Sequence, residues 1–334
     1  MKIIKYSKKY TDIFKIKEDQ FKKNQSNLNS RISINRLYAQ NIKRNKCKNC
    51  SSKKIRKFIK SFGIKYYICS NCGHLNGEFK DTKKFTNQIY YNDGGKNYSK
   101  NYIKDFNLRV KNIYSPKVNF LNSVIKKQKR VLDIGSGGGH FLKALEIKNI
   151  YAKGIEPNKN LVNLANQNLK NNKVILSNMQ DAYKILYKEK KFNILSMIGV
   201  LEHLEDPDKI LKSFKKSHFK YLYLSLPVFS LSVFIENSFK NVFPRHLSGG
   251  HTHLYTEKSI NYLKKKYKLK SIGEWWFGVD MADLFRSMIN SANILDKKLY
   301  LKELDDKFFK HINIFQNILD KNKICSEVHI ILSK

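Results

Sequence analysis

The sequence has no hydrophobic run long enough to cross a bilayer. None of its apolar stretches approaches the roughly 18–20 residues that a spanning helix needs. The first segment, MKIIKY at positions 1–6, also lacks the apolar core of a secretory signal. We therefore expect a cytoplasmic protein without a transmembrane segment, in a compartment where thiols stay reduced.

Acidic residues and arginine are scarce. The chain has 27 aspartates and glutamates against 65 lysines and arginines, which gives a formal net charge of +38. A field of this sign attracts nucleic acid, anionic membranes and phosphorylated small molecules. However, nearly all the cations are Lys, and Asn and Ile are also abundant, so A/T-rich codons explain the composition equally well. Because specific phosphate and base readout favours Arg, genome composition is the better explanation, and a nucleic-acid partner remains the alternative.

Cysteine is also infrequent, with five residues in 334. Four of them form two pairs with 18 residues between the pairs: Cys47 and Cys50, then Cys69 and Cys72. This is the spacing of a tetrahedral zinc site with four thiolate ligands. The sequence therefore predicts a module over residues 47–80 that holds a structural Zn²⁺. We expect His74 to be a surface histidine and Cys325 to be a buried core residue.

Alternating strands and helices follow from Pro116 onward. We predict strands over 130–134, 152–155, 174–176, 192–197, 221–226, 268–277 and 328–332, and helices over 117–127, 141–148, 161–170, 208–216 and 256–267. This alternation predicts an α/β fold with a doubly wound, Rossmann-like, seven-stranded parallel sheet covered on both faces. Thr256 is the predicted N-cap of the last of these helices. The expected organisation is a helical segment over 1–46, the cysteine module, a connector or cap over 81–114, and the main domain over 115–334 with a helical insertion at about 281–322.

A glycine-rich turn follows the first predicted strand of this domain. Gly135, Ser136 and Gly137 come directly after the strand, and Asp133 lies two residues before the first glycine. Glycine lets the backbone approach a ligand closely and present its N–H groups at a helix N-terminus. Glu156 ends the next strand, where a carboxylate accepts hydrogen bonds from ribose hydroxyls. A dinucleotide-binding protein would show the same acid, whereas Asp133 favours S-adenosylmethionine, because it can bind the methionine ammonium through water.

The segment at 192–207 distinguishes these alternatives. It reads FNILSMIGVLEHLEDP and contains Val200, Glu202 and His203. It resembles the fourth-strand segment of class I S-adenosylmethionine-dependent methyltransferases, and the resemblance extends over residues 115–275. Glu202 and His203 either take part in catalysis or only cap and position the next helix. The resemblance implies cofactor contacts from Asp133, Gly135, Ser136, Gly137, Glu156, Asn178, Met179 and Val200, with Asn178 or Met179 beside the adenine.

A long loop at 227–255 follows the fifth strand, at the edge of the sheet where ligands bind in this fold. His251 and His253 are candidate general bases, together with His203, and His253 has the alternative role of packing against the following helix. Arg245, His246 and Tyr255 are candidate acceptor-binding residues, the arginine through a phosphate. The stretch HTHLY at 251–255 is similar to a His-x-His segment of nucleotide-sugar C-methyltransferases of surface-polysaccharide pathways. Those enzymes continue into a further C-terminal domain, whereas this sequence stops at the last predicted strand. The similarity therefore leaves O- or N-methylation of a sugar open as alternatives to C-methylation.

Three functions are compatible with this sequence. The favoured one is methyl transfer to a small acceptor, a sugar or nucleotide sugar of surface-polysaccharide biosynthesis. The second is methylation of RNA with the zinc module as a clamp, for which the lysine excess would bind phosphates. The third is a non-catalytic binding protein, against which the intact acids and glycines of the cofactor motif argue. The sequence leaves the acceptor atom and the oligomeric state open.

Overall fold

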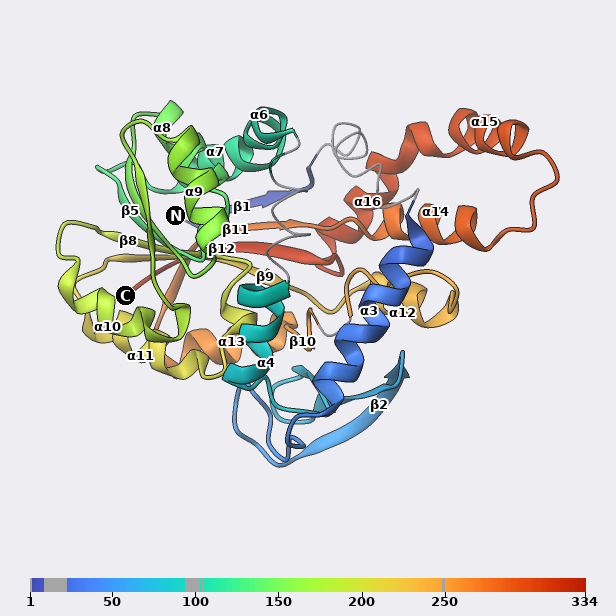
Figure 1. The fold of residues 1–334 in the computed structure, drawn as a ribbon, viewed down its shortest axis with the longest axis horizontal. Coiled ribbons are helices and arrows are strands. Elements are labelled where there is room, and N and C mark those ends of the chain that lie inside the picture. The colour runs from blue at the N-terminus through green and yellow to red at the C-terminus, as the bar shows by residue number, and fades with distance from the viewer. Residues whose placement is uncertain (1, 9–22, 94–102, 104, 248–249) are drawn as a thin grey trace.

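The computed structural model describes residues 2–8, 23–93, 103, 105–247 and 250–334. Its centre is an eight-stranded sheet in the order β1-β11-β12-β9-β8-β5-β6-β7 (Figure 1). The strands are β1 (Ile3–Tyr6), β5 (Arg130–Ile134), β6 (Tyr151–Glu156), β7 (Lys173–Leu176), β8 (Ile194–Ile198), β9 (Tyr221–Pro227), β11 (Lys270–Phe277) and β12 (Glu327–Ser333). The seven predicted strands are therefore present, and the predicted Rossmann-like α/β fold is confirmed.

The sheet differs from the prediction in two respects. Strand β12 runs antiparallel to both of its neighbours, β9 and β11, whereas β5 to β9 pair in parallel, so the sheet is mixed. An eighth strand, β1, pairs in parallel with β11 at the sheet edge. It lies in the segment expected to be helical, whose described part also contains the helix α3 (Asn24–Ala39). Residues 9–22 of the segment lie outside the described residues.

Helices cover both faces of this sheet. One face packs against α7 (Ser115–Val124), α8 (His140–Ile147) and α9 (Lys159–Asn168). The other packs against α10 (Ala182–Lys188), α11 (Pro207–Lys216) and α13 (Glu257–Lys266). Local signals fix where two of them begin. The Asp206 side chain accepts from the Asp208 N–H at the start of α11, and Thr256 caps α13 as the sequence predicts, with Ser259 completing a reciprocal capping box.

A second, four-stranded sheet contains the cysteine-rich segment. Its order is β10-β4-β3-β2, with β2 (Ile55–Ser61), β3 (Ile64–Cys69), β4 (Leu75–Gly77) and β10 (His253–Leu254). Strand β10 belongs to the loop after β9, so the main domain donates an edge strand to the small sheet. The small hydrophobic core likewise combines Tyr38, Tyr66 and Phe85 with Val233 and Leu254. The loop is thus packed into the module, and it also contains α12 (Leu231–Ser238).

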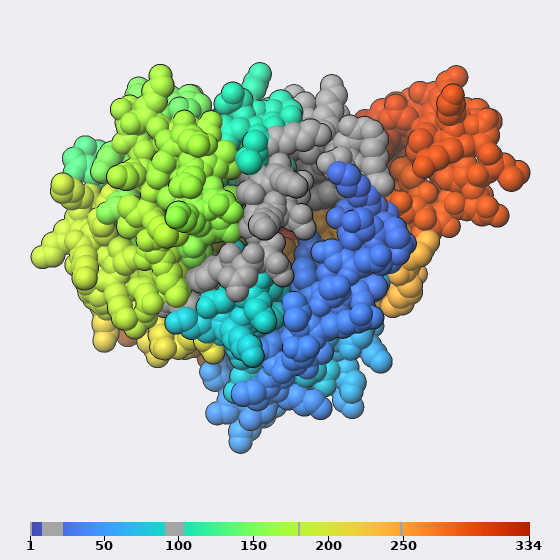
Figure 2. Space-filling model, viewed as in Figure 1, coloured from blue at the N-terminus to red at the C-terminus, as the bar shows by residue number. Residues whose placement is uncertain are grey.

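The remaining helices complete the outline of the molecule. Helices α14 (Asp280–Ser291), α15 (Lys297–Lys307) and α16 (Ile312–Lys321) lie between β11 and β12 and form the orange-to-red lobe in Figure 2. In the segment before α7, the structure describes α4 (Lys83–Asn87), α6 (Phe106–Arg109) and π-helical turns at Gln88–Asp93 and Val110–Tyr114. Short 3₁₀ turns occur at Met179–Asp181, Leu201–His203 and Phe309–His311. Among the helices described, none combines the length and apolarity needed to cross a membrane.

Candidate functional site

The glycine-rich turn joins β5 to α8 at the carboxyl edge of the sheet. Gly135, Gly137 and Gly139 have φ angles of 70°, 54° and 79°, in the region that favours glycine. A Cβ on Gly135 would lie 2.5 Å from Cγ2 of Val200, so a larger residue would displace the end of β8. A Cβ on Gly137 would meet nothing within 4 Å. The turn therefore has no room for a side chain at Gly135, whereas the space beside Gly137 is open.

Glu156 supports this turn from the neighbouring strand. Its Oε2 accepts a 2.8 Å hydrogen bond from the Gly137 N–H, and its Oε1 accepts a 3.0 Å bond from the Asn158 N–H. Burial raises the pKa of the Glu156 carboxyl to about 7, and the two backbone donors oppose that rise. Beside it, the buried Ser136 Oγ has no hydrogen-bond partner among the described residues. A buried hydroxyl without a partner, next to an open turn and a carboxylate, fits a polar ligand.

Asp133 is the second buried carboxyl at this edge. It is 2% exposed, and its Oδ1 accepts a 2.5 Å hydrogen bond from the Ser196 hydroxyl of β8. Burial raises its pKa to about 7, while Ser196 and the positive charge of Lys117 lower it. Two carboxyls on adjacent strands therefore flank one glycine turn, which is the arrangement predicted from the sequence.

Two further predicted cofactor residues meet at the same turn. A Cβ on Gly135 would come within 3.1 Å of Met179 Sδ, as well as contacting Val200. Met179 opens the 3₁₀ turn after β7, and Asn178 precedes it. The structure thus brings Asp133, Gly135, Ser136, Gly137, Glu156, Met179 and Val200 into one continuous region, with Asn178 beside it. Their roles in cofactor binding remain predictions.

A second cluster follows β8. Glu202 and His203 lie in the 3₁₀ turn after that strand, and the His203 ring stacks on that of His251 with a centroid distance of 5.6 Å. His203 Nδ1 is 2.9 Å from the Tyr90 hydroxyl, and His251 Nδ1 is 3.0 Å from the His246 carbonyl oxygen. Burial raises the pKa of Glu202 to about 8 and lowers that of His251 to about 3. Burial also holds the pKa of His203 well below its usual range, so both imidazoles are neutral at pH 7 and are weak bases.

The same three side chains raise the question of a metal. One ligand atom each from Glu202, His203 and His251 lies within 4.8 Å of the others. However, the two imidazole planes are nearly parallel, at 17°. The three ligand atoms nevertheless lie close enough together for one small cation or for hydrogen bonds to a polar ligand.

His253 faces the interior of the protein. It is 1% exposed, its Nε2 lies 2.7 Å from the Glu202 carbonyl oxygen, and its Nδ1 lies 2.9 Å from His74 Nε2. His74 is itself fully buried, so the prediction that it is a surface histidine is wrong. The pairing of β4 with β10 encloses it. These contacts agree with the packing alternative for His253, and its role as a base remains a prediction.

The other predicted acceptor-binding residues also have partners in the protein. Arg245 makes a bidentate ion pair with Asp283, at 2.9 Å from Nε and 2.6 Å from NH2. The buried His246 places its Nε2 2.7 Å from the Val228 carbonyl oxygen, and Tyr255 is 2% exposed. The Arg245 guanidinium is thus neutralised inside the loop. Binding of an acceptor by Arg245, His246 and Tyr255 stays a prediction that no contact tests.

The four module cysteines converge on one point. Their sulfur atoms lie within 4.8 Å of one another, with 3.7 Å between Cys47 and Cys72 and 3.5 Å between Cys50 and Cys69. A tetrahedral site with Zn–S bonds of about 2.3 Å requires sulfurs about 3.8 Å apart. Amide groups lie nearby, Asn76 at 3.5 Å from Cys47 Sγ and Asn49 at 3.6 Å from Cys72 Sγ. The donor set and its spacing therefore fit a tetrahedral, thiophilic metal ion.

The sequence interpretation missed a polar group on β12. Glu327 and His329 are hydrogen-bonded at 2.8 Å, and His329 Nδ1 lies 2.8 Å from the Tyr223 hydroxyl of β9. Two polar residues at positions i and i+2 of an apolar strand share one face, and this was the available signal. By contrast, Cys325 is buried, as predicted.

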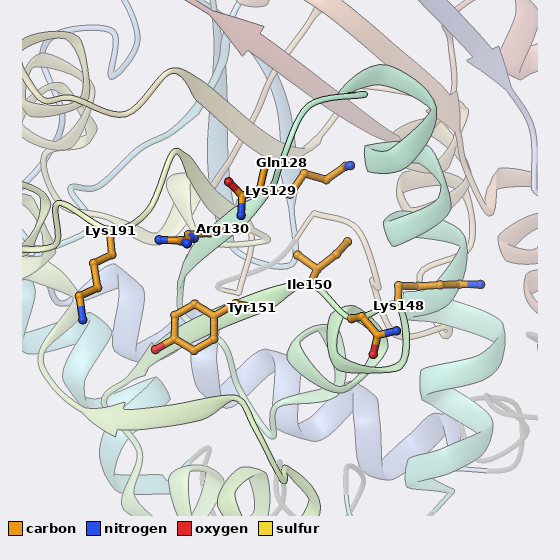
Figure 3. Close-up of a pocket in the computed structure, with 8 residues that line it drawn as sticks. Gln128, Lys129, Arg130, Lys148, Ile150, Tyr151 and Lys191 are labelled. Carbon is orange, nitrogen blue, oxygen red and sulfur yellow. The ribbon is translucent and has the colours of Figure 1, made fainter.

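A recess at the opposite edge of the sheet involves none of these residues. It has a volume of about 600 Å³ and lies where β5 and β6 begin (Figure 3). Four basic side chains and an aromatic ring contribute to its lining: Lys129, Arg130, Lys148, Lys191 and Tyr151. Because ligands of parallel α/β sheets bind at the carboxyl ends of the strands, this recess is separate from the candidate site.

Comparison with known proteins assigns the domain around the glycine turn. The chain is 27% identical over 167 residues to the ubiquinone biosynthesis O-methyltransferase of Pelagibacter ubique, which is 50% of this chain and 60% of that protein. It is 28% identical over 88 residues to the Coxiella burnetii enzyme of the same name, which is 26% of this chain and 38% of that one. The chain thus spans less than two thirds of either relative.

Solved structures give a looser likeness. The magnesium protoporphyrin IX methyltransferase of Synechocystis aligns with 76% of this chain and all of its own, at 11% identity and a TM-score of 0.48. The family model described as a methyltransferase domain matches residues 106–274, just over half of the chain. That match includes β5, β6, β8 and the residues around the glycine turn, and by it the chain belongs to the methyltransferase domain family.

Proposed function

We propose that this chain is an enzyme that transfers a methyl group from S-adenosylmethionine to a small acceptor. One observation carries the proposal. Glu156 braces the Gly137 N–H on one side of an open turn, and Asp133 lies buried on the strand beneath it. The unpartnered Ser136 hydroxyl adds a polar group that fits a bound ligand. Family membership supports the same assignment.

The described residues suit distinct parts of the donor. The Glu156 carboxylate would accept hydrogen bonds from the ribose hydroxyls, and Asp133 would attract the methionine ammonium through water. Met179 and Val200 would offer apolar contacts to the adenine end. When bound, S-adenosylmethionine supplies a methyl group already activated on sulfonium, so the protein mainly has to align the acceptor.

The acceptor is proposed to be a sugar or nucleotide sugar that lies beyond the end of β8. His203 and His251 face each other there as neutral imidazoles, and Tyr90 hydrogen-bonds to the first. Neutral imidazoles can accept a hydrogen bond from an acceptor hydroxyl. The names of the curated relatives, both O-methyltransferases, favour an oxygen acceptor. A role in surface-polysaccharide biosynthesis follows from the His-x-His similarity in the sequence.

For the cysteine cluster we propose a bound zinc ion with a structural role. All four ligand positions would be filled by Cys47, Cys50, Cys69 and Cys72, which leaves no open position for a reacting water. The two Asn amides nearby would donate to the thiolates, as outer-sphere groups of metal sites commonly do. The ion would hold the turns that carry both cysteine pairs.

A direct test incubates the purified chain with methyl-labelled S-adenosylmethionine and a panel of nucleotide sugars, phenols and total RNA. We expect label in a nucleotide sugar or another small hydroxylated molecule, detected by mass spectrometry. Label in RNA, with binding that weakens steeply as salt rises, would favour the RNA alternative. A chain that shows no affinity for S-adenosylhomocysteine by calorimetry would contradict the enzyme assignment altogether.

The raised pKa values of Asp133 and Glu156, both about 7, predict a pH-dependent cofactor affinity. The donor needs both carboxyls ionised, and each is protonated in the ligand-free protein below pH 7. Affinity for S-adenosylhomocysteine should therefore fall as the pH drops from 8 to 6, by about tenfold for each carboxyl that must ionise. Calorimetry across this range measures the effect, and a flat profile would contradict the assignment of these two acids.

A further inference from the structure

Glu327 lies at the same edge of the sheet as the glycine turn. It is the first residue of β12, and its backbone pairs with Pro227 at the end of β9 and Phe277 at the end of β11. Because β9 runs parallel to β8 and β5, its last residue marks the carboxyl edge. The Glu327 side chain therefore starts where ligands of this fold bind.

The partners of this carboxylate among the described residues lie at one of its two oxygens. Oε1 accepts hydrogen bonds from the Ser225 hydroxyl at 3.0 Å and from His329 Nε2 at 2.8 Å. Within the described ranges, Oε2 has no hydrogen-bond or ion-pair partner. The Glu327 side chain is 36% exposed, whereas that of His329 is 0% exposed. A buried support thus presents one carboxylate oxygen to a solvent-reachable space.

The support is fixed from several sides. The Tyr223 hydroxyl lies 2.8 Å from His329 Nδ1, so Tyr223 donates there and the Nε2–H donates to Glu327. The Phe277 ring stacks on His329 at 5.3 Å, with an angle of 21° between the planes. The hydrogen bond from His329, with the positive charges of Lys117 and Lys8, holds the pKa of Glu327 well below its usual range. The carboxylate is therefore ionised and can only accept hydrogen bonds.

The strand order places Glu327 on the acceptor side. The donor residues come from β5, β6 and β8, whereas Glu327 lies two strands beyond β8, past β9. Its negative charge contributes to the raised pKa of Glu202, and it acts in the same direction on His246. Glu327 thus lies at the edge of the sheet from which the loop with the candidate bases emerges, because its strand partner Pro227 begins that loop.

Resting on the proposed function, we infer that Glu327 is a specificity-determining residue whose free Oε2 accepts a hydrogen bond from a hydroxyl or ammonium group of the methyl acceptor. Ser225, His329 and Tyr223 are positioning residues that orient the carboxylate. The chain would thereby favour acceptors that carry a donor group and discriminate against analogues that replace the donor with a methyl group. A site built to hydrogen-bond such a group rejects the analogue lacking it, because its own polar atom is left unpaired.

The test compares binding of matched probes to the whole chain saturated with S-adenosylhomocysteine. Each small alcohol or primary amine of the set is paired with its methyl-terminated isostere, and saturation-transfer NMR measures dissociation constants. For Glu327→Gln we expect the alcohols or the amines to bind at least tenfold more weakly, and the isosteres to bind unchanged. Loss confined to amines would identify an ammonium group, and loss confined to alcohols a hydroxyl. Glu327→Asp, which keeps the charge on a shorter side chain, should give an intermediate loss.

Two controls separate this inference from the proposed function. Affinity for S-adenosylhomocysteine should stay within threefold of wild type in Glu327→Gln, and Glu303→Gln on α15 should alter neither measurement. If the wild-type chain binds the cofactor product but does not distinguish alcohols or amines from their isosteres, the inference is overturned while the methyltransferase assignment stands. Equal weakening of every probe in Glu327→Gln and Glu327→Asp would also overturn it, because the residue would then be only structural.

Discussion

A Glu156→Ala chain should bind S-adenosylhomocysteine at least a hundredfold more weakly than wild type. The substitution removes a charged acceptor for two ribose hydroxyls, and hydrogen bonds to a charged group contribute about 1.5–3 kcal/mol each. It also removes the hydrogen-bond acceptors of the Gly137 and Asn158 N–H groups, so the turn loses two hydrogen bonds that hold its conformation. Both losses act on the same ligand, which makes this one of the two largest effects that we expect. Isothermal titration calorimetry measures it directly.

Two further variants refine this result. Glu156→Gln keeps one carbonyl oxygen that can accept from the turn, and it should fall between wild type and Glu156→Ala. Glu303→Gln removes an exposed carboxylate of α15 that pairs with Lys307, far along the chain from the turn, and should bind like wild type. Undiminished affinity in Glu156→Ala would mean that the donor is held elsewhere, and the proposed function would then lose its main support.

Removal of the cysteine-bound metal should lower the melting temperature by about 10 °C or more. Structural zinc sites contribute folding free energy outright, about 10–16 kcal/mol in small peptides, and the cysteine turns lie outside the hydrophobic core around Tyr38 and Tyr66. Cys47→Ser or treatment with a strong chelator should therefore destabilise the module. Scanning calorimetry gives the melting temperature, and atomic absorption should give one zinc per wild-type chain.

Metal loss should affect methyl transfer to the acceptor more than it affects binding of S-adenosylhomocysteine. Lys48 donates a 3.0 Å hydrogen bond to the Glu202 carbonyl oxygen, and Asn49 donates one of 3.0 Å to the Ser259 carbonyl oxygen. The module thus contacts the turn that carries Glu202 and the start of α13, whereas the two donor carboxyls, Asp133 and Glu156, lie on β5 and β6. We expect affinity for S-adenosylhomocysteine to stay within threefold while methyl transfer falls at least tenfold. Cys325→Ala, which removes a cysteine outside the cluster, should retain the zinc. A parallel loss of cofactor affinity would show that the module also shapes the donor site.

The donor side of the site was predictable because its information is local. An apolar strand, a glycine turn and a helix follow one another within residues 130–147, and the geometry that glycine permits is the geometry the turn needs. Asp133 and Glu156 end neighbouring parallel strands, so the spacing alone brings them together. The same holds for Thr256, whose capping of α13 depends only on Ser259.

The acceptor side was less predictable because its contacts join distant segments. His74 and His253 meet only because β4 pairs with the two-residue strand β10, and neither strand has a clear local signal. Arg245 is an attractive phosphate ligand in the sequence, yet its charge is taken by Asp283 of α14, which the sequence gives no reason to place beside it. Pairings of this kind depend on tertiary packing, which a single sequence does not encode in any short window.

The position of β1 has a consequence for how the polypeptide matures. Ile3 pairs with Gly273 and Tyr6 with Trp276, so β1 leaves the ribosome well before the strand beside which it docks. Before β1 pairs, the outer side of β11 exposes unpaired backbone N–H and C=O groups, which can form hydrogen bonds with strands of other nascent chains. We expect closure by β1 to be a late event, since such distant contacts form slowly. Once paired, β1 covers the edge of β11 and protects it from aggregation with other chains.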